Sequence, residues 1–268
     1  MLRDITLGQY YPADSVIHRL DPRTKLVGTI AFLISLFLYE TFTSYTVATV
    51  FLVMIIRASK VPFKFMIKGL KTIMMLLMIT VVFNLFLTPG KEILHIWKLT
   101  ITQEGLIKAV FMVIRLTWLI IGSSLMTLTT TPNELTDGME KGLSPLKKLH
   151  IPIHELSMMM SIALRFIPIL LEETDKIMKA QTARGADFES GGLIKKAKSL
   201  VPLLVPLFIS AFRRANDLAM AMEARGYRGG EGRTKMKPLI YQRRDYLAYL
   251  ALLSYLVCFC LVGEFVKF

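Results

Sequence analysis

The sequence predicts an all-α, polytopic membrane protein with about five transmembrane helices and long cytoplasmic helices. Two observations carry this prediction: 53% of the 268 residues are hydrophobic, and the apolar residues are gathered into long runs. A soluble chain of this length rarely carries so much apolar content, whereas a multi-spanning membrane protein usually does. The chain also has a net charge of +13. The distribution of the basic residues along the chain indicates whether this charge faces nucleic acid or a membrane surface.

The apolar runs are taken in chain order: 26–39, 45–56, 69–87, 106–128 and 246–262. Each of the first two is shorter than the ~20 residues that span a bilayer, and five residues lie between them. They predict either a tight hairpin of two spans or one long kinked helix. The other three runs are each predicted to form one span.

Basic residues in the loops predict the orientation. From the end of the second run to the start of the third, the chain is basic and holds no acid: Arg57, Lys60, Lys64, Lys68 and Lys71. The next loop balances Lys91 and Lys98 with Glu92 and Glu104. By the positive-inside rule, we expect a transmembrane region over 1–130 with about four spans, a cytoplasmic region over 131–240 and a last span in 241–268. The basic charge is then explained by the cytoplasmic side, without nucleic acid.

Two polar residues fall inside predicted spans, Arg115 and Asn84. An ionisable group at that depth is costly and usually faces the bundle interior or water. Arg115 is therefore expected to snorkel or to pair within the bundle; the alternative is a transport path, as in a stand-alone secondary transporter or channel.

Residues 131–240 predict a short amphipathic helix followed by two long ones. The apolar stripe of the first long helix holds Leu156, Met160, Ala163, Ile167 and Leu170, and that of the second holds Leu200, Leu204, Leu207, Ala211, Ala215, Leu218 and Met222. Internal prolines 168, 202 and 206 predict kinks. Neither helix is expected to cross the membrane. If the first crossed, six basic residues would lie outside, and the apolar core of the second covers only residues 199–212, too short to span.

Both long helices end on the same triplet, Ala183-Arg184-Gly185 and Ala224-Arg225-Gly226, 41 positions apart. Arginine suits the last turn of a helix and glycine the residue after it, so plain helix caps are one explanation. The other is a docking tip: arginine offers five donors to carboxylates and carbonyls of a partner, alanine keeps the surface small, and glycine turns the chain away.

Other chemistry is weakly supported. Met158, Met159 and Met160 form an adaptable apolar surface or ordinary core filling. His150 and His154 have helical metal spacing, but Pro152 lies between them and no third ligand is near, so no metal site is expected. Cys258 and Cys260 lie in an apolar run and are expected to face lipid or core. The sequence contains no G-x-x-x-x-G-K-[ST] phosphate loop, and an enzyme is not predicted.

Three stretches resemble one family: TARGAD, MEARGYRGGEGRT, and ALRFIPILLEETDKIMKAQ before the first. Together with HRLDPRTKL, residues 18–26, they are similar to the T component of energy-coupling factor transporters, the EcfT or CbiQ-like transmembrane protein. The resemblance covers nearly the whole chain.

The resemblance implies a non-catalytic scaffold in a bacterial cell membrane. It joins two cytoplasmic ATP-binding cassette ATPases, which bind ATP and Mg, to a small membrane S component that captures a vitamin or other micronutrient. Ala183, Arg184, Gly185, Ala224, Arg225 and Gly226 would dock in grooves of the ATPases. Met158–Met160, Pro202 and Pro206 are candidates for contact with the S component. Whether the ATPases are identical, and which solute is carried, stays open.

Overall fold

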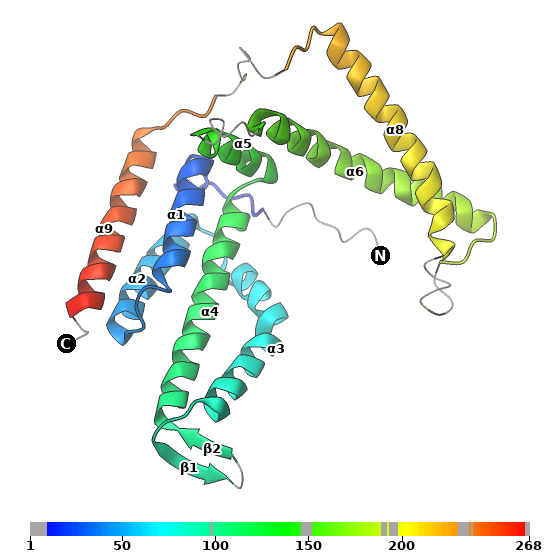
Figure 1. Cartoon of the computed structure of the whole chain (residues 1–268). Coiled ribbons are helices and arrows are strands. Elements are labelled where there is room, and N and C mark those ends of the chain that lie inside the picture. The colour runs from blue at the N-terminus through cyan, green and yellow to red at the C-terminus, as the bar shows by residue number, and fades with distance from the viewer. Residues whose placement is uncertain are drawn as a thin grey trace. The chain divides into compact units, whose positions relative to one another are not determined.

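The computed structural model describes residues 10–96, 99–145, 152–188, 192, 198–229, 236 and 238–265. These residues form a helical protein with one small β-hairpin (Figure 1). The chain divides into two compact units. We call Gly8–Gly138 with Leu239–Phe268 the bundle unit, and Met139–Pro238 the two-helix unit; the latter also includes residues 1–7, outside the described residues.

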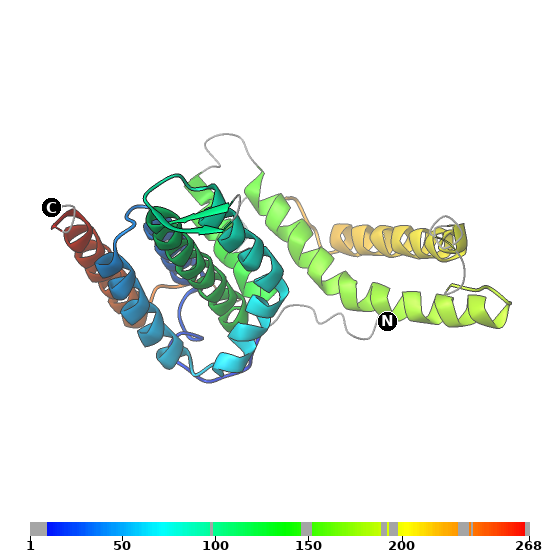
Figure 2. The ribbon, with the colours of Figure 1, turned by 90° about the horizontal axis from the view of Figure 1, so that it is seen from below.

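The bundle unit is built from α1 (Pro22–Ser35), α2 (Phe42–Ser59), α3 (Phe63–Leu87), α4 (Gln103–Thr129) and α9 (Arg243–Phe265). Helix α1 packs against α4 and α9, α2 packs against α9 and α4, and α3 lies along α4 (Figures 1 and 2). Because α1 and α2 are separate helices, the single kinked helix is wrong, and a hairpin in which both helices span the membrane stays a prediction. The side chain of Thr41 starts α2 by accepting a hydrogen bond from the Ser44 amide at 3.4 Å.

Aromatic side chains fill the interior of the bundle. The rings of Phe51 and Tyr255 stack with centroids 4.1 Å apart, and Phe32 and Phe259 lie beside Tyr255. The Tyr255 hydroxyl lies 2.7 Å from the Ser35 hydroxyl, so its polar end is satisfied inside the core. The core therefore joins α1, α2 and α9 across the middle of the unit.

Among the described residues, four helices are long and apolar enough to cross a membrane: α2, α4, α9 and α6 (Ile153–Ala183). Helix α3 contributes a shorter apolar stretch, Ile73–Leu87. The polytopic all-α class is confirmed. Helix α1 has 14 residues and rises ~21 Å, less than the ~30 Å hydrocarbon layer. All four helices qualify by length and composition alone, so the predicted place of α6 beside the membrane stays a prediction.

A β-hairpin lies where we predicted only a loop. Strands β1 (Glu92–Ile96) and β2 (Leu99–Thr102) pair antiparallel between α3 and α4. Both strands contain β-branched residues, Ile93 and Ile96 in β1 and Thr100, Ile101 and Thr102 in β2. Such residues favour strands, and the prediction of a loop considered only its charges. The hairpin leads directly into α4, whose first turn is capped by the buried Thr102 hydroxyl, 3.1 Å from the Gly105 amide.

Arg115 pairs within the bundle, as expected. Its guanidinium donates to the Glu40 carboxylate at 2.6 Å and to the Tyr45 hydroxyl at 2.9 Å. Glu40 lies in the turn between α1 and α2, so the carboxylate that pairs with Arg115 comes from outside the predicted spans. The Asn84 amide instead donates to the Thr80 carbonyl of its own helix at 2.9 Å. The two polar residues that could have supported a transport path have separate partners.

Candidate functional site

The two-helix unit consists of α6 and α8 (Val201–Ala224), which cross in Figure 1 and run alongside one another in Figure 2. The start of α6 is tied to the end of α5 (Pro132–Gly142): Glu140 lies 2.9 Å from the His154 ring and accepts from the Ser157 hydroxyl at 2.8 Å. His154 is thus held by a carboxylate, and His150 lies outside the described residues. No group of three potential metal ligands occurs in the described part of the chain.

Polar contacts define how α6 and α8 cross. The Gln181 amide donates to the Pro202 carbonyl at 3.3 Å, so the end of α6 lies beside the start of α8. Further along, Glu173 accepts from the Ser210 hydroxyl at 3.0 Å and from the Arg214 guanidinium at 2.5 Å. The helices are therefore antiparallel. Helix α8 has 24 residues and is ~36 Å long, which sets the approximate separation of the two triplets.

The first triplet closes α6 with a Schellman motif. Ala183 is the last helical residue and Arg184 the cap, with φ −89° and ψ 8°. Gly185 follows in the left-handed region at φ +88°. The Gly185 amide donates to the Thr182 carbonyl at 2.9 Å and the Ala186 amide to the Gln181 carbonyl at 3.0 Å, the two bonds that define the motif.

The second triplet closes α8 in the same way. Arg225 has the same φ and ψ as Arg184, and Gly226 has φ +69°. The Gly226 amide donates to the Glu223 carbonyl at 2.8 Å and the Tyr227 amide to the Met222 carbonyl at 3.0 Å. A Cβ at either glycine would meet nothing within 4 Å. Within this chain, glycine is therefore required by backbone conformation and not by packing.

The side chains of Arg184 and Arg225, unlike the two glycines, are not needed to form the helix ends. Ala183, Arg184, Ala224 and Arg225 are all exposed. Neither guanidinium has a hydrogen bond or ion pair with another side chain among the residues that the structure describes. By contrast, the half-exposed Arg214 is engaged by Glu173. The structure thus shows two equivalent helix ends, each presenting an unengaged cation beside a small side chain and a turn.

The other predicted contact residues are divided. Met159 and Met160 are 54% and 51% exposed, whereas Met158 is half-buried. Pro206 lies inside α8, but Pro202 belongs to its first turn, so the kink predicted at Pro202 is wrong. Proline at that position removes no helical hydrogen bond, because the first amides of a helix have no intrahelical partner.

The predicted apolar stripe is right for the second half of α8 and wrong for the first half of α6. A cavity of about 280 Å³ between the helices is lined by Ala211, Ala215, Leu218 and Met222 from α8. From α6 it is lined by Ile162, Phe166 and Leu170, while Leu156 and Met160 are exposed. Helix α6 is apolar on several sides over this stretch, so periodicity alone did not select the packed side.

The sequence analysis did not predict one polar cluster. It used the HRLDPRTKL stretch only for the family resemblance and assigned no contacts to its charged residues. Asp21, Arg23 and Lys25, from the HRLDPRTKL stretch, lie near Asp245 of α9, which is 2% exposed. Burial raises the pKa of Asp21, but hydrogen bonds from Arg23 outweigh it, and the pKa lies below its ordinary value. The signal that could have found Asp245 is an acid in the first turn of an apolar span.

The fold and this surface define a polytopic, all-α membrane protein with two exposed arginine helix ends. The family model described as CbiQ, cobalt transport protein, matches residues 13–236. The chain is 58% identical to the energy-coupling factor transporter transmembrane protein EcfT of Clostridium kluyveri, over 98% of each chain. It is 56% identical to the EcfT of Thermosediminibacter oceani (93% and 94% covered) and 48% to that of Bacillus subtilis (94% and 96%). The chain belongs to the EcfT family of energy-coupling factor transporter transmembrane proteins.

Proposed function

We propose that this chain is the non-catalytic scaffold of an energy-coupling factor transporter. It joins two cytoplasmic ATPase subunits, which bind ATP and Mg, to a membrane S component that captures a vitamin or other micronutrient. Closure of the ATPase pair on ATP moves the ends of α6 and α8, and the two helices pass this movement to the S component. The bundle unit holds the assembly in the bacterial cell membrane, with residues 131–240 on the cytoplasmic side.

The observation that carries the proposal is the pair of equivalent arginine ends. Arg184 and Arg225 are exposed, have the same cap geometry and leave their donors without a side-chain partner in the described residues. A planar guanidinium favours carboxylates and carbonyls in a groove, where each charge-assisted hydrogen bond contributes more than a neutral one. Two such ends on crossed helices suit a partner with two similar subunits.

Apolar side chains on the same helices support contact with the S component. Met159 and Met160 on α6 are half exposed, and Phe208 and Phe212 on α8 are 61% and 69% exposed. Exposed apolar surface of this kind marks a protein or membrane contact. Methionine adapts its shape to different partners, which favours this surface for an S component that must move.

The test is an affinity purification from native membranes, comparing wild type with Arg184→Glu plus Arg225→Glu. A matched control, Lys179→Glu plus Arg213→Glu, makes the same change in charge at exposed positions of the same two helices. We expect ATPase subunits and ATP hydrolysis to accompany the wild type and the control, and to be lost from the double tip variant. Retention of the ATPases by the tip variant, or their absence from the wild type, would overturn the proposal.

A further inference from the structure

The segment His18–Lys25, which we call the anchor segment, holds both places where the chain leaves and rejoins the bundle unit. The two-helix unit is inserted between Gly138 and Leu239 of the bundle unit. The outgoing connection follows α4, and the returning connection precedes α9. The anchor segment is far from both in sequence, yet it makes hydrogen bonds to each.

On the outgoing side, Lys25 closes the end of α4. Its ammonium donates to the Thr129 carbonyl at 2.8 Å and to the His18 carbonyl at 3.0 Å. The last carbonyls of a helix lack intrahelical partners and carry partial negative charge, so a buried cation stabilises this end. Pro22 also packs closely on the next helix, since a Cβ at Gly138 would lie 2.8 Å from the Pro22 ring.

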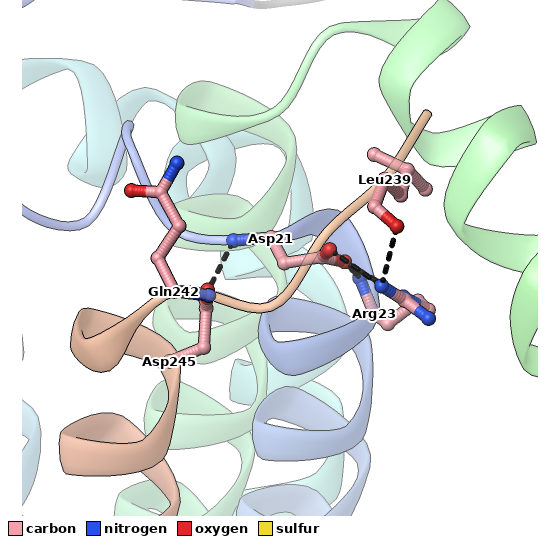
Figure 3. A network of polar contacts seen from close by, with 5 residues as sticks. All are labelled: Asp21, Arg23, Leu239, Gln242 and Asp245. Carbon is pink, nitrogen blue, oxygen red and sulfur yellow. Dashed lines mark hydrogen bonds and ion pairs between the residues drawn. The ribbon is translucent and has the colours of Figure 1, made fainter. Parts of the chain in front are cut away.

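On the returning side, Asp21 and Arg23 hold the start of α9 (Figure 3). The Asp21 amide donates to Asp245 at 2.8 Å, and the other Asp245 oxygen accepts from the Gln242 amide at 2.8 Å. The Arg23 guanidinium donates to the Leu239 carbonyl at 3.3 Å and to the Asp21 carboxylate at 2.9 Å.

The guanidinium of Arg23 also lies over the ring of Tyr241, 3.9 Å from its centroid. Such cation–π contact adds to the hold on the returning connection. Apart from the Arg23–Asp21 pair, the contacts on this side therefore involve residues 239–245, the first residues after the insertion.

The charges of this cluster balance and are mostly buried. Asp21, Lys25 and Asp245 are 7%, 7% and 2% exposed, and the Arg23 side chain is 15% exposed. Two acids and two bases form hydrogen bonds with backbone atoms of α1, of α4 and of the segment that precedes α9. A buried network that satisfies all its members holds backbone in place, whereas a partly broken one leaves an uncompensated charge.

We propose that the anchor segment is the joint through which movement of α6 and α8 reaches the membrane bundle. Because Thr129, Gly138 and residues 239–245 all contact one short segment, a pull that arrives at either end of the insertion reaches α4 and α9 together. This inference rests on the proposed function. Arg23 is then a positioning residue for transport, since it touches neither solute nor nucleotide.

The test uses the complete transporter, purified with its ATPases and S component and reconstituted in vesicles. Arg23→Gln is compared with the control Arg19→Gln, four residues away, whose ion pair with Asp14 is exposed and touches neither connection. The readouts are ATPase content, ATP hydrolysis, and solute carried per ATP. We expect Arg23→Gln to keep its ATPases and hydrolysis while solute per ATP falls about five-fold or more, as for loss of a typical coupling between sites. The control stays at the wild-type ratio.

A second variant avoids the buried charges. Tyr241→Leu, at a residue 36% exposed, removes the ring that lies beneath Arg23 and against Tyr246 and Tyr249 of α9. Because the hydrogen bonds of Arg23 are kept, we expect a smaller loss in the same ratio. Hydrogen exchange over residues 239–245 should be faster in both variants and unchanged in Arg19→Gln. An unchanged ratio in Arg23→Gln, or loss of its ATPases together with transport, would overturn the joint. Absence of ATPases from the wild type would instead overturn the proposed function, and the joint with it.

Discussion

Replacing Gly185 by alanine separates what the backbone requires at the end of α6 from what a partner requires. At φ +88° an L-residue is strained, and the added Cβ meets nothing within 4 Å. The cost is therefore conformational only, about 1 kcal/mol for alanine in the left-handed region, and less for asparagine. Gly226→Ala is expected to behave in the same way, because φ there is +69° and its surroundings are equally open.

The magnitude can be measured locally, because an end that frays opens without unfolding the whole chain. Hydrogen exchange of the Ala186 amide, which donates to Gln181 across the motif, should be about five-fold faster in Gly185→Ala, the factor that corresponds to about 1 kcal/mol at 25 °C. Gly185→Asn should lie between alanine and wild type. Exchange in the bundle unit, which contains neither residue, serves as the internal control.

Retention of the ATPases by Gly185→Ala tests whether a partner also requires the glycine. If the tip docks in a groove that closes on the glycine, ATPase retention falls by clearly more than five-fold, because the Cβ then meets partner atoms. A loss matching the exchange result would mean that glycine serves only the cap. Unchanged Ala186 exchange would refute the reasoning, since the left-handed glycine would then not limit the end of the helix.

Three further outcomes follow from the bundle unit. Glu40→Gln leaves the Arg115 guanidinium without its carboxylate, and because Glu40 is exposed we expect a loss of about 1 kcal/mol, read as a lower thermal midpoint in detergent. Folding lowers the pKa of Asp21, so the ionised carboxylate stabilises the protein at pH values above its unfolded pKa. This stabilisation is lost as the pH falls through the folded pKa. The thermal midpoint of wild type should therefore lose its advantage over that of Asp21→Asn below about pH 4. A Cβ at Gly263 would lie 2.5 Å from the Tyr39 ring, so Gly263→Ala should cost about 1–3 kcal/mol by forcing the ring aside, and an unchanged midpoint would contradict that packing.

Much of the fold follows from local patterns. Long apolar runs predict helices and a membrane environment because burying backbone in lipid requires internally satisfied hydrogen bonds. The cap signal of arginine followed by glycine located the ends of α6 and α8 to the residue, since only glycine reaches the left-handed region freely. Pairing of Arg115 was also predictable, because a cation at that depth needs a partner.

Other features depend on contacts that no local pattern contains. The packed side of α6 was predicted wrongly because several of its sides are equally apolar, and only α8 selects among them. The hairpin between α3 and α4 was missed because its strands stabilise each other across the turn. Glu40 was not recognised as the partner of Arg115, because pairing joins a turn to a helix 75 positions away.

The sequence alone determined the membrane class, the helix content and the two arginine ends, since these depend on apolar length, charge and the φ angle that glycine permits. Only the tertiary structure decided that the two ends share one geometry with both guanidiniums exposed, and that the anchor segment joins α4 to α9. Asp21 and Asp245 are 224 positions apart, and their contact arises because the packed helices bring their ends together, where buried charges must be balanced.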